Sequence, residues 1–179
     1  FYTLLKIAPT PGCIHAQLDY FQPRINDLLD TKQAPLHICI AARKHRMVED
    51  LIARGASVHT LTSSGESPLH IAAKTGDIDT VGTLLTHGAN LFALSPAGNS
   101  PLMVAAQSFH AGVADFLLQH GAMVNQQNNQ GKTALMLAAA SSTRAMIETL
   151  HQHHADLALF DEQGQTAVEY AKMHKNPQM

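Results

Sequence analysis

The chain is 179 residues long, and its composition excludes several classes of protein. Charged residues make up 15% and the net charge is −2, so binding of nucleic acid or of an anionic membrane surface is not expected. Hydrophobic residues reach 45% but aromatic ones only 5%, which favours a small aliphatic core over disorder or an aromatic-rich β-sandwich.

Residues 1–31 leave two interpretations open. Pro9 and Pro11 would end a first helix early, and a helix is expected somewhere in 13–30. The segment is either a degenerate unit of the repeat described next or an unrelated N-terminal helical cap. Because the chain does not begin with Met, we expect it to be a fragment of a longer protein.

A repeat of 33 residues organises the rest of the chain. One glycine series stands at 65, 98, 131 and 164, and a second, in phase with it, at 55, 88 and 121. Such a period is typical of solenoids and repeat arrays. The spacing divides the chain into four units and a C-terminal half-repeat cap, with predicted bounds 32–64, 65–97, 98–130, 131–163 and 164–179.

Each unit predicts two short antiparallel helices. In the second unit, Ser67-Pro68 is a typical helix start, because the hydroxyl accepts a free amide and proline has none to leave unpaired. Apolar residues then recur at helical spacing on both sides of Gly76, and Gly88 ends the second helix. Neither helix is long enough to be stable alone, so each unit must pack against its neighbours.

These units resemble ankyrin repeats. The family pattern is Thr-Pro-Leu-His-x-Ala-Ala, then Gly, then Val-x-x-Leu-Leu-x-x-Gly-Ala, and residues 65–97 follow it almost throughout. The resemblance covers the chain from about residue 32 and implies a mainly α solenoid of stacked antiparallel helix pairs joined by β-hairpin-like loops. The motif histidine is present at two positions, His37 and His70, and the later units replace it with Met103, Met136 and Glu169.

Four glycine positions of the pattern hold other residues. Arg43, Phe109 and Ser142 replace the glycine between the two helices, and His154 replaces the helix-ending glycine. Local backbone strain or altered loops are expected at these positions.

The chain has 12 histidines, and the cluster His151, His153 and His154 beside Asp156 could be taken for a metal site. However, the column of His87, His120 and His153 suits C-terminal capping of helices, and ligands on successive repeats are too far apart for one metal. We therefore expect no metal site and no cofactor. No catalytic set can be assembled either, so we do not expect an enzyme.

The resemblance implies that a partner protein binds in the concave groove, through connector tips and late positions of the first helix of each unit. This groove is mostly neutral and rich in amides, which favours hydrogen bonding to a peptide or a folded protein. The residues expected to contact the partner are Glu66, Lys74, Thr75, Asn99, Gln107, Ser108, Phe109, Asn129, Lys132, Ser141 and Gln165.

Two local features each have two interpretations. The basic run from Arg43 to Arg46 is either a solvated loop or a docking site for an acidic partner. Phe109 is either an exposed aromatic anchor or folded back onto its own unit.

Three functions remain open. The first is a non-catalytic scaffold that binds a partner protein and acts as a monomer in the cytoplasm. The second is a targeting module that presents substrates to an enzyme domain elsewhere in a longer chain, and a bacterial effector acting on host proteins in the host cytosol is a special case of either. The third is a purely structural or oligomerising array. No apolar run is long enough to insert into a membrane.

Overall fold

The computed structural model describes residues 26–27, 33–140 and 144–175, and all regular elements in these ranges are helices. The helix expected within 13–30 lies outside the described residues. The helices are α3 (Pro35–Ala41), α4 (His45–Ala53), α5 (Pro68–Thr75), α6 (Ile78–Thr86), α7 (Pro101–Gln107), α8 (Ala111–Gln119), α9 (Ala134–Ala140), α10 (Arg144–Gln152) and α11 (Ala167–Lys175).

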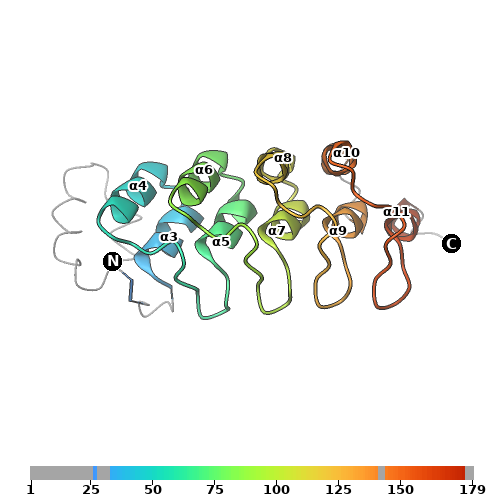
Figure 1. Ribbon diagram of the computed structural model, residues 1–179, viewed down its shortest axis with the longest axis horizontal. Helices are drawn as coiled ribbons and strands as arrows, with labels where there is room; N and C mark the ends of the chain where they lie inside the picture. Colours follow the sequence, from blue (N-terminus) through green and yellow to red (C-terminus); the bar gives the residue numbers. More distant parts are fainter. Residues whose placement is uncertain (1–25, 28–32, 141–143, 176–179) are drawn as a thin grey trace.

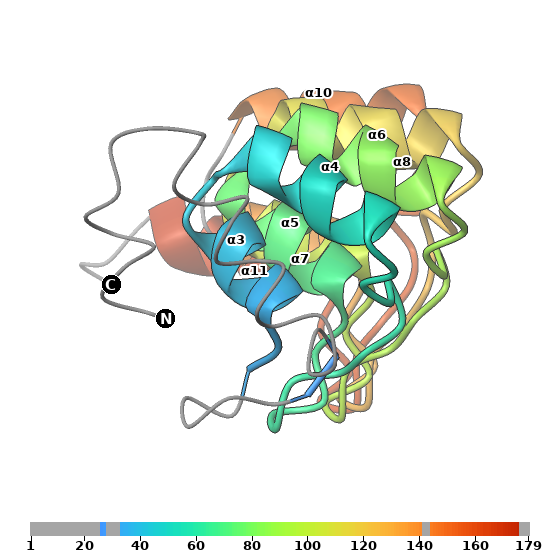
Figure 2. The ribbon, with the colours of Figure 1, turned by 90° about the vertical axis from the view of Figure 1, so that its left-hand side faces the viewer.

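The helices form two parallel rows (Figure 1). An inner row contains α3, α5, α7, α9 and α11, and an outer row contains α4, α6, α8 and α10. Long connectors join each outer helix to the next inner helix, and all of them project to the same side of the rows (Figure 2). The mainly α repeat solenoid expected from the sequence is thereby confirmed.

Polar residues fix where the inner helices begin. Ser67 and Ser100 are extended N-cap residues whose hydroxyls accept the backbone amides of His70 and Met103. A proline follows each of them in the first turn, as the sequence predicts. Ala34 is the N-cap of α3 and has no side-chain acceptor, so that first helix begins without this stabilisation.

Leucines at matching positions build the core. Every one of eight core leucines is at most 3% exposed, and small alanines beside them let the two rows approach closely. Because each inner helix packs mainly against its neighbours in the array, nearest-neighbour interfaces carry the stability. The leucines of the inner helices are Leu36, Leu69, Leu102 and Leu135, and those of the outer helices are Leu51, Leu84, Leu117 and Leu150.

Of the strain or altered loops expected where glycine is lost, the structure shows strain at the three described positions. Arg43, Phe109 and His154 have φ values of 54°, 65° and 61°, which cost free energy for any residue with a Cβ. Ser142 lies outside the described residues. Gly76 occupies the turn equivalent to those of Arg43 and Phe109, with φ 76°.

Candidate functional site

Each connector ends in the same hydrogen-bonded tip. In the second one the Ser95 amide donates to the Asn99 carbonyl at 3.0 Å, and the Gly98 amide donates to the Ser95 carbonyl at 2.8 Å. The Asn99 amide also donates to the Ser95 hydroxyl at 3.2 Å. Equivalent bonds recur in the connectors that begin at Thr62, Asn128 and Asp161. The tips are therefore held in one shape before any partner binds.

Amide side chains tie neighbouring connectors together. Asn129 donates from its side chain to the Pro96 carbonyl at 2.9 Å and from its backbone to the Ala97 carbonyl at 3.1 Å. Asn128 donates to the side-chain oxygen of Asn99 at 2.7 Å. The sequence predicts that Asn99 and Asn129 contact a partner. In the structure, the side chains of both residues form hydrogen bonds between neighbouring connectors instead of pointing freely to solvent.

Gln127 has a linking role that the sequence analysis missed. Its side-chain amide donates to the Gly131 carbonyl at 2.7 Å and to the Phe160 carbonyl at 2.9 Å, and so joins two connectors. In the sequence, the one sign of this role is the place of Gln127 directly before a connector tip.

Lys74, Gln107 and Phe109 are the predicted site residues most open to solvent. All three are exposed, and within the described part of the chain none makes a side-chain hydrogen bond or ion pair. The exposed fraction of Phe109 is 55%, so it does not fold back onto its own unit. These three residues lie at the ends of α5 and α7 or just after them.

The other predicted residues are less available. Thr75 donates its hydroxyl to the Ala72 carbonyl at 3.0 Å, and Glu66 accepts from the Ser64 hydroxyl at 3.1 Å. Ser108 is the half-buried C-cap of α7, and Gln165 is half-buried in the last connector tip. Ser141 lies outside the described residues.

Lys132 belongs to a small polar cluster at the C-terminal end. Its Nζ lies 5.4 Å above the ring of Tyr170, whose hydroxyl donates to Asp161 Oδ2 at 2.7 Å. Burial alone would raise the pKa of Asp161, but the hydrogen bonds from Tyr170 and from the amides of Gln165 and Gln163 lower it. The Asp161 carboxylate therefore stays ionised and helps to fix the last connector on α11.

The two motif histidines are buried and bridge neighbouring elements. His37 accepts the Ala34 amide on Nδ1 at 3.1 Å and donates from Nε2 to the Thr60 carbonyl at 2.7 Å. His70 donates from Nε2 to the Asn99 carbonyl at 2.9 Å. Burial lowers the pKa of both imidazoles, so they stay neutral near pH 7 and act as structural links.

Two of the three histidines expected to cap outer helices do so. Nδ1 of His87 donates to the Thr83 carbonyl at 2.8 Å, and Nδ1 of His120 donates to the Phe116 carbonyl at 2.7 Å. The prediction is wrong for the third, His153, whose Nε2 lies 2.8 Å from Asp115 Oδ1 on α8. The imidazole reaches this carboxylate because α8 and α10 pack side by side, and an ionisable partner binds it more strongly than a carbonyl.

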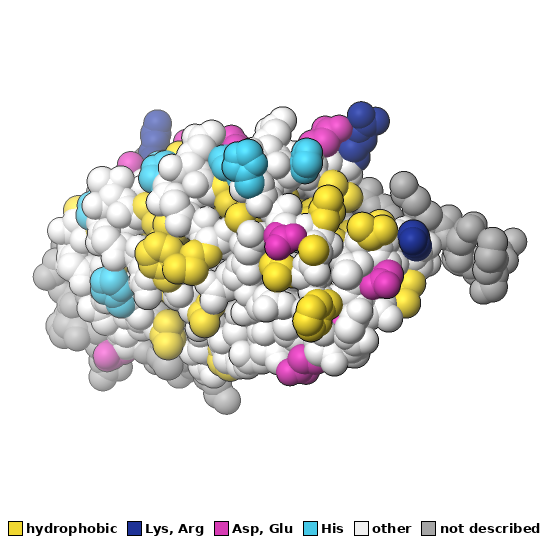
Figure 3. All heavy atoms as spheres, turned by 45° about the vertical axis from the view of Figure 1, so that its right-hand side comes forward, with side chains coloured by type: hydrophobic (Ala, Val, Ile, Leu, Met, Phe, Trp, Pro, Cys, Tyr) yellow, Lys and Arg dark blue, Asp and Glu magenta, His cyan; other side chains and the backbone are white. Residues whose placement is uncertain are grey.

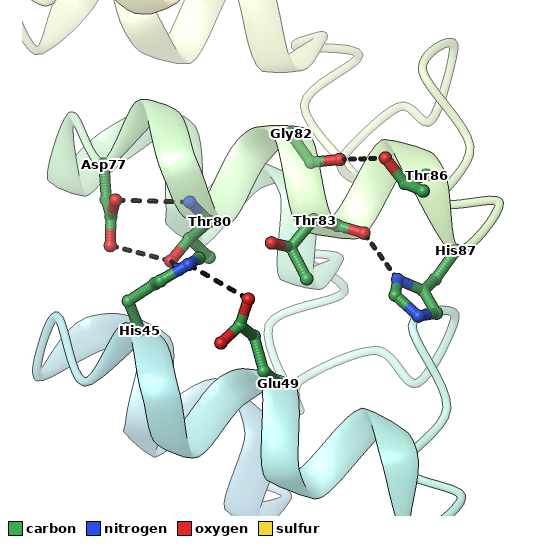
Figure 4. A network of polar contacts seen from close by, with 8 residues as sticks. All are labelled: His45, Glu49, Asp77, Thr80, Gly82, Thr83, Thr86 and His87. Atoms are coloured by element: carbon green, nitrogen blue, oxygen red, sulfur yellow. Dashed lines mark hydrogen bonds and ion pairs between the residues drawn. The ribbon is translucent and has the colours of Figure 1, made fainter.

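A second polar link joins α4 to α6 (Figure 4). Thr80 is fully buried, and its hydroxyl donates to Asp77 Oδ2 at 2.7 Å. The hydroxyl oxygen can then accept from Nδ1 of His45 at 3.2 Å, while Nε2 of His45 lies 3.4 Å from Glu49. The sequence analysis did not identify this network, because Thr80 stands where the equivalent residues are apolar.

The surface offers shape and polarity more than reactive chemistry. The face in Figure 3 shows hydrophobic groups below a row of histidines, with Lys and Arg only near its edges. Among the described residues, no three side chains of His, Cys, Asp or Glu are arranged to hold a metal ion. Burial raises the pKa of the Cys39 thiol to about 12, which makes it a poor nucleophile.

None of the described helices is long and apolar enough to cross a membrane.

Comparison with known families agrees with this geometry. The family described as ankyrin repeats, in three copies, matches residues 13–93, 36–128 and 102–179. The chain therefore belongs to the ankyrin-repeat family, whose members are generally protein–protein interaction modules without catalytic activity. A comparison with curated proteins gives no match.

Proposed function

We propose that the chain is a non-catalytic scaffold that binds a partner protein through the surface formed by the connector tips and the ends of the inner helices. The observation that carries this proposal is the set of exposed, unengaged side chains there: Lys74, Gln107 and Phe109. They stand at or just after the ends of helices that neighbouring units hold in place, so little order has to be gained on binding.

The connector tips support the same proposal. Their backbones are fixed by internal and inter-connector hydrogen bonds, so the tips keep one shape before a partner binds. We infer that Glu66, Asn129 and Gln165 contribute as the rim of the surface, where individual contacts are weak.

The proposal takes the chain to act as a monomer in the cytoplasm and not as an enzyme. Its two cysteines are too few for a disulfide framework, which favours a reducing compartment. The buried Cys39 thiol also supports a binding role, since it offers no nucleophile to a substrate.

A pull-down with a double variant tests the surface. Lys74→Ala with Gln107→Ala removes two exposed side chains that make no hydrogen bond or ion pair with described residues, so the fold should be unaffected. We expect the variant to lose most of the partner that the unchanged chain captures, at an unchanged melting temperature.

The matched control changes the outer row. Gln119→Ala with Arg144→Ala removes one amide and one cation from α8 and α10, where each donates a hydrogen bond to a carboxylate of its own helix. The control should retain the partner in full. Equal partner yields for the two double variants would contradict the proposed surface.

A further inference from the structure

We propose that the row of turns joining inner to outer helices docks an acidic segment of a partner protein that carries an apolar side chain further along. This row comprises the turn at 42–46, the turn at 74–77 and the turn at 107–110. The inference rests on the proposed function and names the chemistry of the partner at one edge of the same surface.

The first observation is backbone strain that the side chains of the strained residues do not offset. The backbone bonds of the turns, from the Lys44 amide to the Cys39 carbonyl at 2.9 Å and from the His110 amide to the Ala105 carbonyl at 3.0 Å, need no particular side chain. Arg43 and Phe109 are left-handed with φ of 54° and 65°, whereas the equivalent residue between them is Gly76. A left-handed residue with a Cβ costs about 1 kcal/mol, and burial of its side chain could offset that cost. Both side chains are instead exposed, so folding of this chain gains nothing from them. Arginine and aromatic residues are also the types that most often anchor interfaces.

The second observation is a group of cations without anions. Arg43, Lys44, Arg46 and Lys74 are all exposed, and none forms an ion pair with a residue that the structure describes. Within the turns 42–46 and 74–77 the one carboxylate is Asp77, which accepts the Thr80 amide at 3.2 Å. Glu49, which lies 3.4 Å from Nε2 of His45, and the exposed Asp79 follow these turns in the outer helices. Cations outnumber carboxylates here, although the whole chain has a net charge of −2. A partner complementary to these two turns is acidic.

The third observation is that the turns are in register. Nε2 of His110 lies 3.1 Å from the Lys74 carbonyl oxygen, and a Cβ on Gly76 would lie 2.5 Å from Nδ1 of the same ring. Because neighbouring helices pack about 10 Å apart, Arg43 and Phe109 are separated by roughly 20 Å. An extended chain covers that distance in about six residues.

These observations define a probe. It is a synthetic peptide with a block of Glu residues, a Gly/Ser spacer of about six residues and a terminal Phe that can pack on Phe109. Fluorescence anisotropy of the labelled peptide would measure its affinity for the full chain. Comparison peptides replace Glu by Lys, shorten the spacer to about two residues, or replace the terminal Phe by Ser.

Glycine variants separate binding from folding. Arg43→Gly and Phe109→Gly place in each turn the residue that Gly76 shows to be compatible, so both variants should fold at least as well as the unchanged chain. We expect each to weaken binding of the acidic peptide about tenfold. The matched controls Arg144→Gly and Met123→Gly, exposed on α10 and on a connector, should leave the affinity unchanged.

The acidic peptide with the long spacer should bind most tightly. Its affinity should decrease as the NaCl concentration is raised from about 20 mM to about 200 mM. The inference is overturned if the peptide does not bind, if the Lys peptide binds as well, or if the glycine variants bind as the controls do. If any of these occurs while the pull-down still depends on Lys74 and Gln107, the proposed function stands and only the acidic partner is wrong. If the peptide binds but the double variant at Lys74 and Gln107 captures as much partner as the unchanged chain, the proposed surface is refuted and the docking row is retained.

Discussion

The first two inner helices and the next two are built alike but linked to the array differently. In α3 and α5 a buried imidazole, His37 or His70, spans from the helix start to a connector carbonyl. In α7 and α9 the same position holds Met103 or Met136, each 1% exposed, which fills the space without a polar bond. One fold therefore tolerates either link, because the leucine core rather than the bridge supplies most of the free energy.

The largest expected effect tests whether the two regions share that core. Leu69→Ala in α5 and Leu102→Ala in α7 should each lower the free energy of unfolding by about 2–5 kcal/mol, because each leaves a cavity in a closely packed interface. Urea denaturation measures both. The exposed Leu94→Ala is the control and should change little. A urea midpoint that neither core substitution lowers would contradict the stacking of the helices.

The next effect separates the two kinds of link. His70→Met leaves the Asn99 carbonyl and the Ser67 amide without their partner, and should cost about 1–3 kcal/mol. Met103→Leu keeps volume and polarity and should cost less than about 1.5 kcal/mol. Urea midpoints of the two variants give the comparison, and equal losses would show that the imidazole bridge contributes nothing of its own.

Acid should affect the two regions unequally. Burial holds the pKa values of His37 and His70 in the folded chain below the ordinary value of 6.5, so the unfolded chain binds more protons as the pH falls below 6.5. The stability due to these neutral imidazoles is complete above that pH and is lost as the pH falls through the folded pKa. Hydrogen exchange between about pH 7 and pH 5 should show lost protection in α3 and α5 before α7 and α9.

A double variant provides the control for this pH effect. His37→Met with His70→Met should remove the difference between the two regions over the same interval. Asp161 has a lowered pKa, and its contribution is lost only as the pH falls below the ordinary aspartate value of 3.8, outside that interval. Uniform loss of protection along the unchanged array would contradict the role assigned to the histidines.

The smallest expected effect is a gain in stability. Arg43→Gly and Phe109→Gly relieve left-handed strain and should each raise the free energy of unfolding by about 1 kcal/mol. Gly76→Ala should lower it, because φ is 76° and the new Cβ would lie 2.5 Å from His110. Thermal melts of the three variants check both signs, and a Gly76→Ala protein as stable as the unchanged chain would refute the explanation.

The sequence predicts what depends on local chemistry. Ser67-Pro68 indicates a helix start, and the glycine columns indicate the period. The loss of glycine at Arg43 and Phe109 predicts strain or altered loops, and the structure shows strained, left-handed turns there. The helix start and the turns depend on residues within a few positions of one another, and the period on the recurrence of that local pattern.

Contacts between units were not predictable in the same way. His153 pairs with Asp115, 38 positions earlier, and Gln127 reaches Phe160 in the next connector. Thr80 likewise needs Asp77 and His45 to be satisfied. Such pairs depend on how successive units are rotated when they stack, and a repeating pattern fixes the column of a residue but not the direction of its side chain.

The central claim is that the partner binds on the inner row, and site-specific photo-crosslinking tests it most directly. A photoreactive amino acid would replace Gln107 at the end of α7 or, in a second protein, Gln119 at the end of α8, both exposed. We predict a crosslinked partner from position 107 and none from position 119, with similar melting temperatures for the two proteins. Crosslinking from position 119 alone would contradict the account.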